Sequence, residues 1–329
     1  MSSSVSVSVI IPSRNRPTLL RKAIQSVLEQ SHRETEILVV NDGSDGPNLA
    51  AYQSLAAELK SRVLMLDLEA TERGHGQSYA INRGVERAQG EFVTFLDDDD
   101  FWTDPEHLAR ASRALCAADS SIDLYYTNQA AYLGDEQVKG PLWLEELEHI
   151  VKTTHRPDGE GVYDVSVEDL MRCNGFQHLN TSVVRRTLYL DIGGMDENIR
   201  YECDWDFYLR CIDVARGIRY FPGMTSHHNA PDPSKTLNMS TVVTVLQKLL
   251  FRSYVMDKAV LFSKSPAIRK AATRNKGYTL KRITEKLVSD GNYELAAVYA
   301  RESLSTGLSP KWLLYCGYLG LRALAQPRA

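Results

Sequence analysis

The sequence has no closely spaced pair of cysteines. Its 329 residues include five cysteines, an odd number, and no two of them stand at CxxC spacing. Neither a disulfide framework nor a zinc cluster is therefore indicated. This cysteine usage fits a reducing cytoplasm best.

Long hydrophobic runs and a large net charge are missing as well. Residues 1–11 alternate Ser with Val and carry no basic leader, which is typical of a strand rather than of a secretory signal. The apolar stretch at 312–324 is interrupted by Gly317, Gly320 and Arg322 and is too short to span a bilayer, so it could only lie on a membrane. The formal net charge of -4 gives no general attraction for nucleic acid, which is not an expected partner.

The composition is that of a folded globular chain, and the length favours one large α/β domain with a smaller appendage. Apolar runs that alternate with helical spacing predict a mostly parallel sheet with helices on both faces. The predicted strands are 5–11, 36–40, 63–68 and 92–96, and the predicted helices are 19–28, 48–59 and 77–88.

The alternating pattern does not continue evenly to the C-terminus. It weakens at 132–165, where we expect a variable insertion or an acceptor-side loop. We expect the core domain to occupy 1–230 and a helical region with helical hairpins to occupy 231–329. Within the core, the later pattern predicts a strand at 181–186, a helix at 204–214 and a strand at 218–221.

The strongest chemical signal is a run of four carboxylates, Asp97 to Asp100, directly after the predicted strand 92–96. Ligands of open α/β sheets bind beyond the carboxyl ends of the strands, so these groups are delivered to the expected crevice. A divalent cation, Mn²⁺ or Mg²⁺, would neutralise them and offset charge on a diphosphate leaving group. The alternative is a solvated turn that caps a helix beginning at Pro105.

Two other loops could contact a nucleotide. Asp42 ends the second predicted strand, where its carboxylate can accept hydrogen bonds from a base or a ribose, although Asn-Asp-Gly-Ser is also an ordinary turn composition. The loop at 12–15 could wrap a nucleotide or serve only as a helix entry. The loop at 74–76 ends in Gly76 before a predicted helix, whose N-terminus could face phosphates.

Two further pairs are candidates for chemistry. Asp204 and Asp206 stand at a predicted helix start, where one of them could act as a general base toward an acceptor hydroxyl. Acids in a first turn can also serve only the helix dipole. His227 and His228 follow the last predicted strand and could bind a metal or a phosphate, or neither.

Taken together and in this order, the segments resemble the family 2 glycosyltransferases, which have the GT-A fold. The resemblance covers roughly residues 5–228, and few other families show the same succession. The motifs are Val9-Ile10-Ile11-Pro12-Ser13-Arg14-Asn15-Arg16-Pro17, Ile37-Leu38-Val39-Val40-Asn41-Asp42-Gly43-Ser44, Ala80-Ile81-Asn82-Arg83-Gly84, Phe95-Leu96-Asp97-Asp98-Asp99-Asp100, Gly193-Gly194-Met195-Asp196-Glu197 and Asp204-Trp205-Asp206.

The resemblance implies a role for each matching position. Asp99 is implied to be the metal ligand of the DxD element, with His228 near the diphosphate and the metal. Asp204 is implied to be the catalytic base of an inverting displacement. The implied nucleotide-binding residues are Pro12, Ser13, Arg14, Asn15 and Asp42, with Asp97 or Asp98 on the ribose or the sugar.

The resemblance also implies the partners. The donor is expected to be a nucleotide-diphosphate sugar, with a UDP-sugar favoured, and the acceptor a glycan, a lipid-linked or a protein-linked hydroxyl. Peripheral contact with the inner face of a membrane through the C-terminal helices is a further hypothesis. A nucleotidyltransferase and a catalytically inactive nucleotide-sugar-binding module are the alternatives.

The sequence departs from the family pattern at several places: Gly74 sits where many members have Asn, and the run of four aspartates leaves the register of the DxD pair open by one residue. Cys203 stands where the family usually has Glu, which removes an acidic partner beside Asp204. No QxxRW segment follows the predicted helix 204–214, so transfer of a single sugar is expected rather than processive synthesis.

Overall fold

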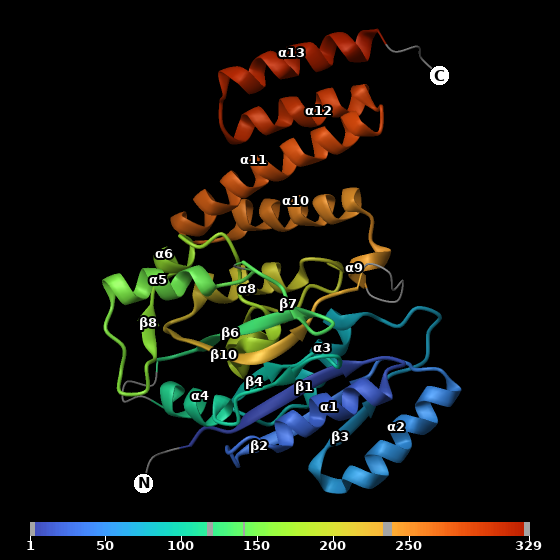
Figure 1. Ribbon diagram of the computed structural model, residues 1–329, viewed down its shortest axis with the longest axis vertical. Helices are drawn as coiled ribbons and strands as arrows, with labels where there is room; N and C mark the ends of the chain where they lie inside the picture. The colour runs from blue at the N-terminus through green and yellow to red at the C-terminus, as the bar shows by residue number, and fades with distance from the viewer. Residues whose placement is uncertain (1–3, 117–120, 141, 233–238, 326–329) are drawn as a thin grey trace. The chain divides into compact units, whose positions relative to one another are not determined.

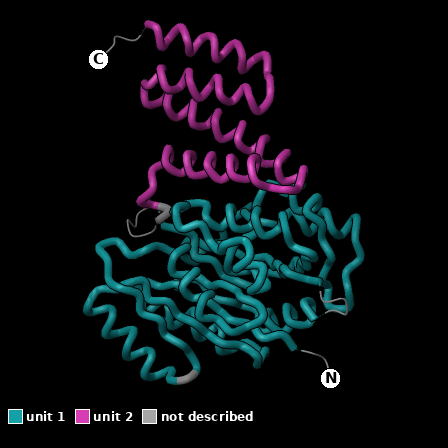
Figure 2. The backbone as a smooth tube through the Cα atoms, turned by 180° about the vertical axis from the view of Figure 1, so that it is seen from behind, with its two compact units in different colours: residues 1–232 teal, residues 233–329 magenta. Residues whose placement is uncertain are grey.

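The computed structural model describes residues 4–116, 121–140, 142–232 and 239–325. The chain forms two compact units, unit 1 at Met1–Asp232 and unit 2 at Pro233–Ala329 (Figure 2). Their boundary lies two residues beyond the position expected from the sequence, residue 230.

Unit 1 is built on one mixed sheet, with the strand order β3-β2-β1-β4-β9-β6-β10-β5 (Figure 1). The strands from β3 to β4 are mutually parallel, β9 runs antiparallel to both of its neighbours, and β10 is again parallel to β6. The short strands β7 and β8 pair with β6 and β10. The strands are β1 (Val7–Ser13), β2 (Thr35–Asn41), β3 (Leu64–Asp67), β4 (Phe92–Phe95), β5 (Phe101–Trp102), β6 (Leu124–Leu133), β7 (Glu136–Gln137), β8 (Tyr163–Val165), β9 (Ser182–Arg185) and β10 (Ile218–Asn229).

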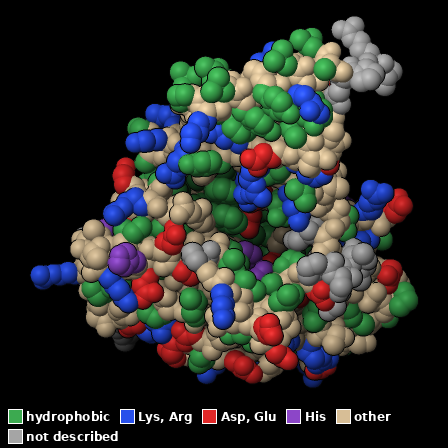
Figure 3. All heavy atoms as spheres, turned by 45° about the horizontal axis from the view of Figure 1, so that its top comes forward, with side chains coloured by type: hydrophobic (Ala, Val, Ile, Leu, Met, Phe, Trp, Pro, Cys, Tyr) green, Lys and Arg blue, Asp and Glu red, His purple; other side chains and the backbone are tan. Residues whose placement is uncertain are grey.

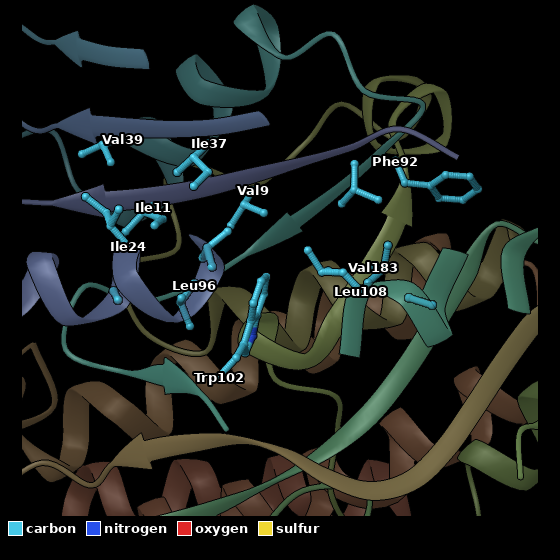
Figure 4. Packing of buried hydrophobic residues seen from close by; sticks show 14 of the residues in the cluster. Val9, Ile11, Ile24, Ile37, Val39, Phe92, Leu96, Trp102, Leu108 and Val183 are labelled. Atoms are coloured by element: carbon cyan, nitrogen blue, oxygen red, sulfur yellow. The ribbon is translucent and has the colours of Figure 1, made fainter. Parts of the chain in front are cut away.

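Helices cover both faces of this sheet, so the predicted α/β fold is confirmed. In β1, Val9 and Ile11 point to one face and pack with residues of α1, α2 and α4, and Figure 4 shows them beside Ile24 of α1. Ile10 points to the other face, toward α3. The helices of unit 1 are α1 (Pro17–Leu28), α2 (Gly46–Leu59), α3 (Gln77–Arg87), α4 (His107–Leu115), α5 (Glu145–Thr154), α6 (Val167–Leu170), α7 (Arg186–Asp191) and α8 (Cys203–Val214), with 3-10 turns η1 (Lys60–Arg62) and η2 (Leu179–Thr181).

Three local predictions were wrong. Residues 132–165 are not one loop, because they contain β7, β8 and the helix α5, which buries Leu147 and Val151. Pro105 precedes its helix in a turn, and α4 begins at His107. The last strand is far longer than 218–221, because bulges after Phe221 let β10 bend and continue to Asn229 along β6.

Unit 2 is helical, as predicted. Its consecutive helices pack on one another around a small apolar core that includes Leu280, Ile283 and Leu319. Across the described part of the chain, every helix is too short or too polar to traverse a bilayer. The helices are α9 (Met239–Val242), α10 (Val245–Phe262), α11 (Pro266–Ser289), α12 (Tyr293–Ser303) and α13 (Pro310–Leu324), with the 3-10 turn η3 (Leu304–Thr306).

Gly84 allows α3 to lie close to the sheet, and we predict that Gly84→Ala destabilises unit 1. An added Cβ would lie 2.5 Å from Ile10 Cγ2 and 3.0 Å from Val40 Cγ2, both within a closed core. The expected loss is about 1–3 kcal/mol of the free energy of unfolding, measured by urea denaturation. Gly159→Ala is the control, because its Cβ would meet nothing within 4 Å, and it should change stability by less than about 0.5 kcal/mol. Equal stability of the two variants would contradict close packing at Gly84.

Candidate active site

Polar side chains from three neighbouring parallel strands meet at one edge of the sheet. Ser13 at the end of β1 pairs with Asn41 at the end of β2, and Ile10 of β1 pairs with Phe95 at the end of β4. The turn after β4 returns to β1, because Ser13 Oγ donates to Asp98 Oδ2 at 2.6 Å. This edge is the position at which open α/β sheets bind ligands.

The four aspartates after β4 alternate between two environments. Asp98 and Asp100 are buried, whereas Asp97 and Asp99 are partly exposed. Burial raises the pKa of Asp98 to about 6, although the charge of Arg16 acts in the opposite direction. Burial and the neighbouring carboxylates also raise the pKa values of Asp97 and Asp99. The exposed pair therefore has the spacing of a DxD element with Asp98 between.

Arg16 forms ion pairs with this acidic turn. The sequence alone assigned it no role. Its Nη1 lies 3.2 Å from Asp98 Oδ1 and 3.0 Å from Asp99 Oδ2. The side chain is brought there by the start of α1, directly after the loop at 12–15. The sequence signal that could have identified Arg16 is its position directly after the first predicted strand and its loop.

Asp100 joins the acidic turn to the far side of the sheet. Its carboxylate accepts from the Asn229 backbone N–H at 2.7 Å and lies 2.7 Å from His228 Nδ1. Asn180 Nδ2 also donates to it, from the turn before β9. These bonds satisfy a carboxylate that is only 1% exposed, so Asp100 acts as a structural anchor.

A second cluster, Asp97, His178 and His228, has the donor set of a metal site. One ligand atom from each residue lies within 4.8 Å of the others. Burial lowers the pKa of His178 to about 3, which keeps that imidazole neutral, as a metal ligand must be. His228 uses Nδ1 toward Asp100, which leaves Nε2 for a ligand in the arrangement common to metal-binding histidines. Asp99 lies outside this cluster.

The two histidines of this cluster lie at positions that the sequence did not predict. His228 lies inside β10, paired with Ala131 of β6, rather than after the strand. His178 caps the turn η2, with its Nδ1 accepting from the Asn180 N–H at 3.3 Å, and no sequence motif marked it. His227 points elsewhere and stacks between Tyr132 and Phe101.

Asp42 holds the glycine loop that precedes α3. Its Oδ1 accepts from the His75 backbone N–H at 2.8 Å, and its Oδ2 accepts from the Gly76 N–H at 2.9 Å. Gly74 has a φ of 70°, and an added Cβ would lie 2.6 Å from Asp42 Oδ2. The loop at 74–76 is thus fixed against the end of β2, with the uncapped N-terminus of α3 behind it.

The predicted residues at 12–15 divide between strand and loop. Pro12 lies within β1 opposite Val40. Arg14 Nη2 donates to the carbonyls of Thr71 and Glu72, so it supports the loop after β3. Asn15 has a φ of 57° and its Oδ1 accepts from the Asp45 N–H at 3.0 Å, which ties this loop to the start of α2.

The start of α8 distinguishes Asp204 from Asp206. Asp206 is buried and paired with Arg210 Nε at 2.8 Å, which commits it to the helix. Asp204 is partly exposed, and burial together with the Glu202 carboxylate raises its pKa to about 7. Glu202 itself has a left-handed backbone with a φ of 65°. An acidic partner is therefore present beside Asp204 although residue 203 is Cys.

We predict that Arg16→Gln destabilises the metal-free protein more at about pH 8 than at about pH 4.5. The pKa of Asp98 is about 6 in the folded protein, above the usual 3.8. The contribution of Asp98 to the free energy of unfolding therefore falls as the pH rises from about 4 to above 6. Arg16 limits this fall, because its charge favours ionised Asp98. Urea denaturation at both pH values measures the difference.

Arg21→Gln is the control for that experiment. Its pair with Glu58 is exposed on both sides and should contribute no more than about 1 kcal/mol at either pH. A loss for Arg16→Gln that is the same at both pH values would contradict a stabilising role of Arg16 toward Asp98.

Comparison with known proteins finds glycosyltransferases. The family model described as Glycosyl transferase family 2 matches residues 8–162. The chain is 29% identical over 212 residues to the uncharacterized glycosyltransferase YwdF of Bacillus subtilis, an alignment that covers 64% of this chain and 69% of the relative. It is 28% identical over 224 residues to the succinoglycan biosynthesis protein ExoW of Rhizobium meliloti, covering 64% and 65%.

Solved structures share the fold. The crystal structure of S. aureus TarS 1-349 in complex with UDP-GlcNAc aligns over 97% of this chain and 88% of that chain, with a TM-score of 0.67 at 16% identity. The matches to curated relatives thus extend over about two thirds of their length, and the structural match over nearly the whole chain. Residues 8–162 thus match the family 2 glycosyltransferases, and the fold of the chain is similar to that of solved GT-A glycosyltransferases.

Proposed function

We propose that the protein transfers one sugar from a nucleotide-diphosphate sugar to an acceptor hydroxyl by an inverting, metal-dependent displacement. The observation that carries this proposal is the pairing of an acidic turn at a sheet edge with Asp204, a partly exposed carboxylate whose pKa is near neutrality. The charge of His228 lowers the pKa of Asp204, which supports placing the acidic turn and the start of α8 at one site.

The donor would occupy the edge formed by β1, β2 and β4. We place the base and ribose beside Asp42 and the loop at 12–15. The backbone N–H groups of α3 from Gln77 onward, which no side chain caps, would be available to a phosphate. Of the two carboxylates implied to contact the ribose or the sugar, Asp98 is buried and bonded to Ser13 and Arg16, which leaves the partly exposed Asp97. A UDP-sugar is the favoured donor, which the likeness to the UDP-GlcNAc complex of TarS supports at the level of the fold.

Asp97, His178 and His228 would hold a divalent cation, Mn²⁺ or Mg²⁺. Their donors are two imidazole nitrogens and a carboxylate oxygen, which suit Mn²⁺ better than Mg²⁺, a cation that prefers oxygen ligands. When bound, the ion would offset the charge that develops on the diphosphate leaving group. Asp99 is the second candidate ligand, and in this structure it is paired with Arg16 instead.

Asp204 would act as the general base. Its carboxylate accepts the proton of the acceptor hydroxyl while the acceptor oxygen bonds to the anomeric carbon and the bond to the diphosphate oxygen breaks. One displacement of this kind inverts the anomeric centre. A pKa of about 7 suits the task, because about half of the carboxyl is then ionised at neutral pH and the ionised form accepts a proton readily.

The acceptor is proposed to be a hydroxyl of a glycan, free or linked to a lipid or a protein. Succinoglycan synthesis by ExoW supports a growing polysaccharide. The free state of all five cysteines, four of them buried, supports action in a reducing compartment such as the cytoplasm.

We predict that His178→Asn and Asp97→Asn each weaken Mn²⁺ binding in the presence of UDP at least about tenfold, because each removes one of three protein ligands. Electron paramagnetic resonance of free Mn²⁺ measures the affinity. His149→Asn, on the exposed face of α5, is the control and should bind Mn²⁺ normally. Loss of binding in Asp99→Asn, with normal binding in His178→Asn, would assign the ion to Asp99 and reject the cluster.

We predict that Asp204→Asn lowers turnover at least about a hundredfold and leaves UDP affinity unchanged, because the general base is lost while the donor edge is intact. Glycosyl transfer and isothermal titration with UDP measure the two effects. Asp213→Asn, at the other end of α8, is the control. Turnover near that of the wild type in Asp204→Asn would remove this residue from the mechanism.

The pH dependence of kcat/KM should follow the ionisation of Asp204. The reaction needs ionised Asp204, so kcat/KM should rise with pH and level off above about 7. Glu202 raises the pKa of Asp204, so Glu202→Gln should move this limb to lower pH. A limb that stays in place in Glu202→Gln would contradict the coupling between the two carboxylates.

A further inference from the structure

Unit 2 contains a basic pocket that has no part in the proposed transfer. The cavity has a volume of about 590 Å³ and lies between α11 and the turn that leads into α13. Three of its lining side chains are cations and none is an acid. The lining residues used below are Lys270, Arg274, Gly277, Lys281, Leu308 and Ser309.

The cations of the pocket are not neutralised by the protein. Within the described residues, Lys270 and Arg274 have no hydrogen-bond or ion-pair partner, and the Lys281 ammonium lies 5.2 Å from the centre of the Trp312 ring. Lys276 of the same helix differs, since it pairs with Asp257 at 2.6 Å and Glu302 at 3.4 Å. The pocket therefore carries positive charge that no described carboxylate compensates.

The backbone adds to this positive potential. Ser309 precedes α13 without capping it, and Pro310 follows as the first helical residue, so the N-terminus of this 15-residue helix opens beside the pocket. Gly277 allows the turn η3 to close on α11, because an added Cβ would lie 2.3 Å from Thr306 Oγ1. A pocket with three cations and a helix N-terminus suits a phosphate group.

An apolar surface continues from the pocket along α13. Leu308 lines the pocket and is 83% exposed. One face of α13 packs into the core of unit 2 through Cys316 and Leu319, but the opposite face is also apolar. Figure 3 shows hydrophobic side chains gathered with Lys and Arg on the helical unit. The exposed side chains of this outer face of α13 are Leu313, Leu314, Tyr318, Leu321 and Leu324.

The charges on α13 have one sign. Lys311 and Arg322 are its only charged residues, and both are exposed cations. A helix that is apolar on its exposed face and carries only basic charges is complementary to a surface with negative head groups over hydrocarbon. The surface of an acidic protein would be less complementary than a membrane, because it has no hydrocarbon layer in which five large apolar side chains could be buried.

We propose that unit 2 binds the surface of an anionic phospholipid membrane, with a lipid phosphate in the basic pocket and the outer face of α13 in the interface. The proposal goes beyond the transfer reaction and does not depend on it. It places the enzyme at a lipid surface, where a lipid-linked acceptor would be found.

Sedimentation with vesicles tests the proposal. The full chain should bind vesicles of equal parts phosphatidylcholine and phosphatidylglycerol at least about tenfold more tightly than vesicles of phosphatidylcholine alone, and added salt should weaken this binding. Asp204→Asn should bind as the wild type does, which separates membrane binding from catalysis. Failure to bind either kind of vesicle would overturn the proposal.

Two sets of variants separate the pocket from the apolar face. Lys270→Gln, Arg274→Gln and Lys281→Gln together should remove the preference for anionic vesicles. Arg282→Gln, Lys286→Gln and Arg301→Gln together change the charge of unit 2 equally outside the pocket and should retain that preference. Equal effects of the two triple variants would overturn the role of the pocket. Leu314→Ser with Leu321→Ser should weaken binding to both kinds of vesicle while the thermal stability is kept.

Two other occupants give distinct results. Binding of soluble glycerol 3-phosphate that the pocket variants abolish, without vesicle binding, would overturn the membrane and assign the pocket to a soluble phosphate. A dimer that Leu314→Ser with Leu321→Ser dissociates, without vesicle binding, would overturn the membrane in favour of a second copy of the chain.

Discussion

The crowding of four carboxylates after β4 is the constraint on which the candidate active site depends. A buried carboxylate is tolerated only when its oxygens are hydrogen-bonded or paired with a cation. The partners of Asp98 come from the end of β1 and the start of α1, and those of Asp100 come from η2 and β10. The acidic turn therefore draws together elements that are more than a hundred residues apart in the chain.

Alternation along this turn gives its residues different functions. The two buried aspartates are bonded within the protein. Asp98 contacts Ser13 and Arg16, and Asp100 contacts His228. The two that face outward, Asp97 and Asp99, keep raised pKa values because few donors compensate for burial and mutual repulsion. Crowded carboxylates with raised pKa values favour a cation, so the stability of this turn and its proposed affinity for metal have one physical origin.

The sequence was sufficient for the elements whose hydrophobic period is regular. The strands β1, β2 and β4 and the helices between them follow from that period, and parallel pairing then places Asp42 and Asp97 at one edge. It was not sufficient for His178 or Arg16, because their roles depend on contacts across the sheet. The helix α5 was missed because its apolar positions, such as Leu147 and Val151, are few among acidic residues. The bulges that lengthen β10 are tertiary features without a period.

Cys203 stands where the family resemblance implies Glu, and a neighbouring residue supplies an acid beside Asp204. Burial raises the pKa of the Cys203 thiol to about 12, so this residue is neutral and contributes no charge. Glu202 adopts a left-handed backbone, a conformation that costs roughly 1–2 kcal/mol for a residue with a Cβ. Its carboxylate nevertheless raises the pKa of Asp204. Such strain persists only where the surrounding structure enforces it, and here it retains an acidic neighbour for the proposed base. Burial and the Glu202 carboxylate therefore raise the pKa of Asp204 without an acid at residue 203.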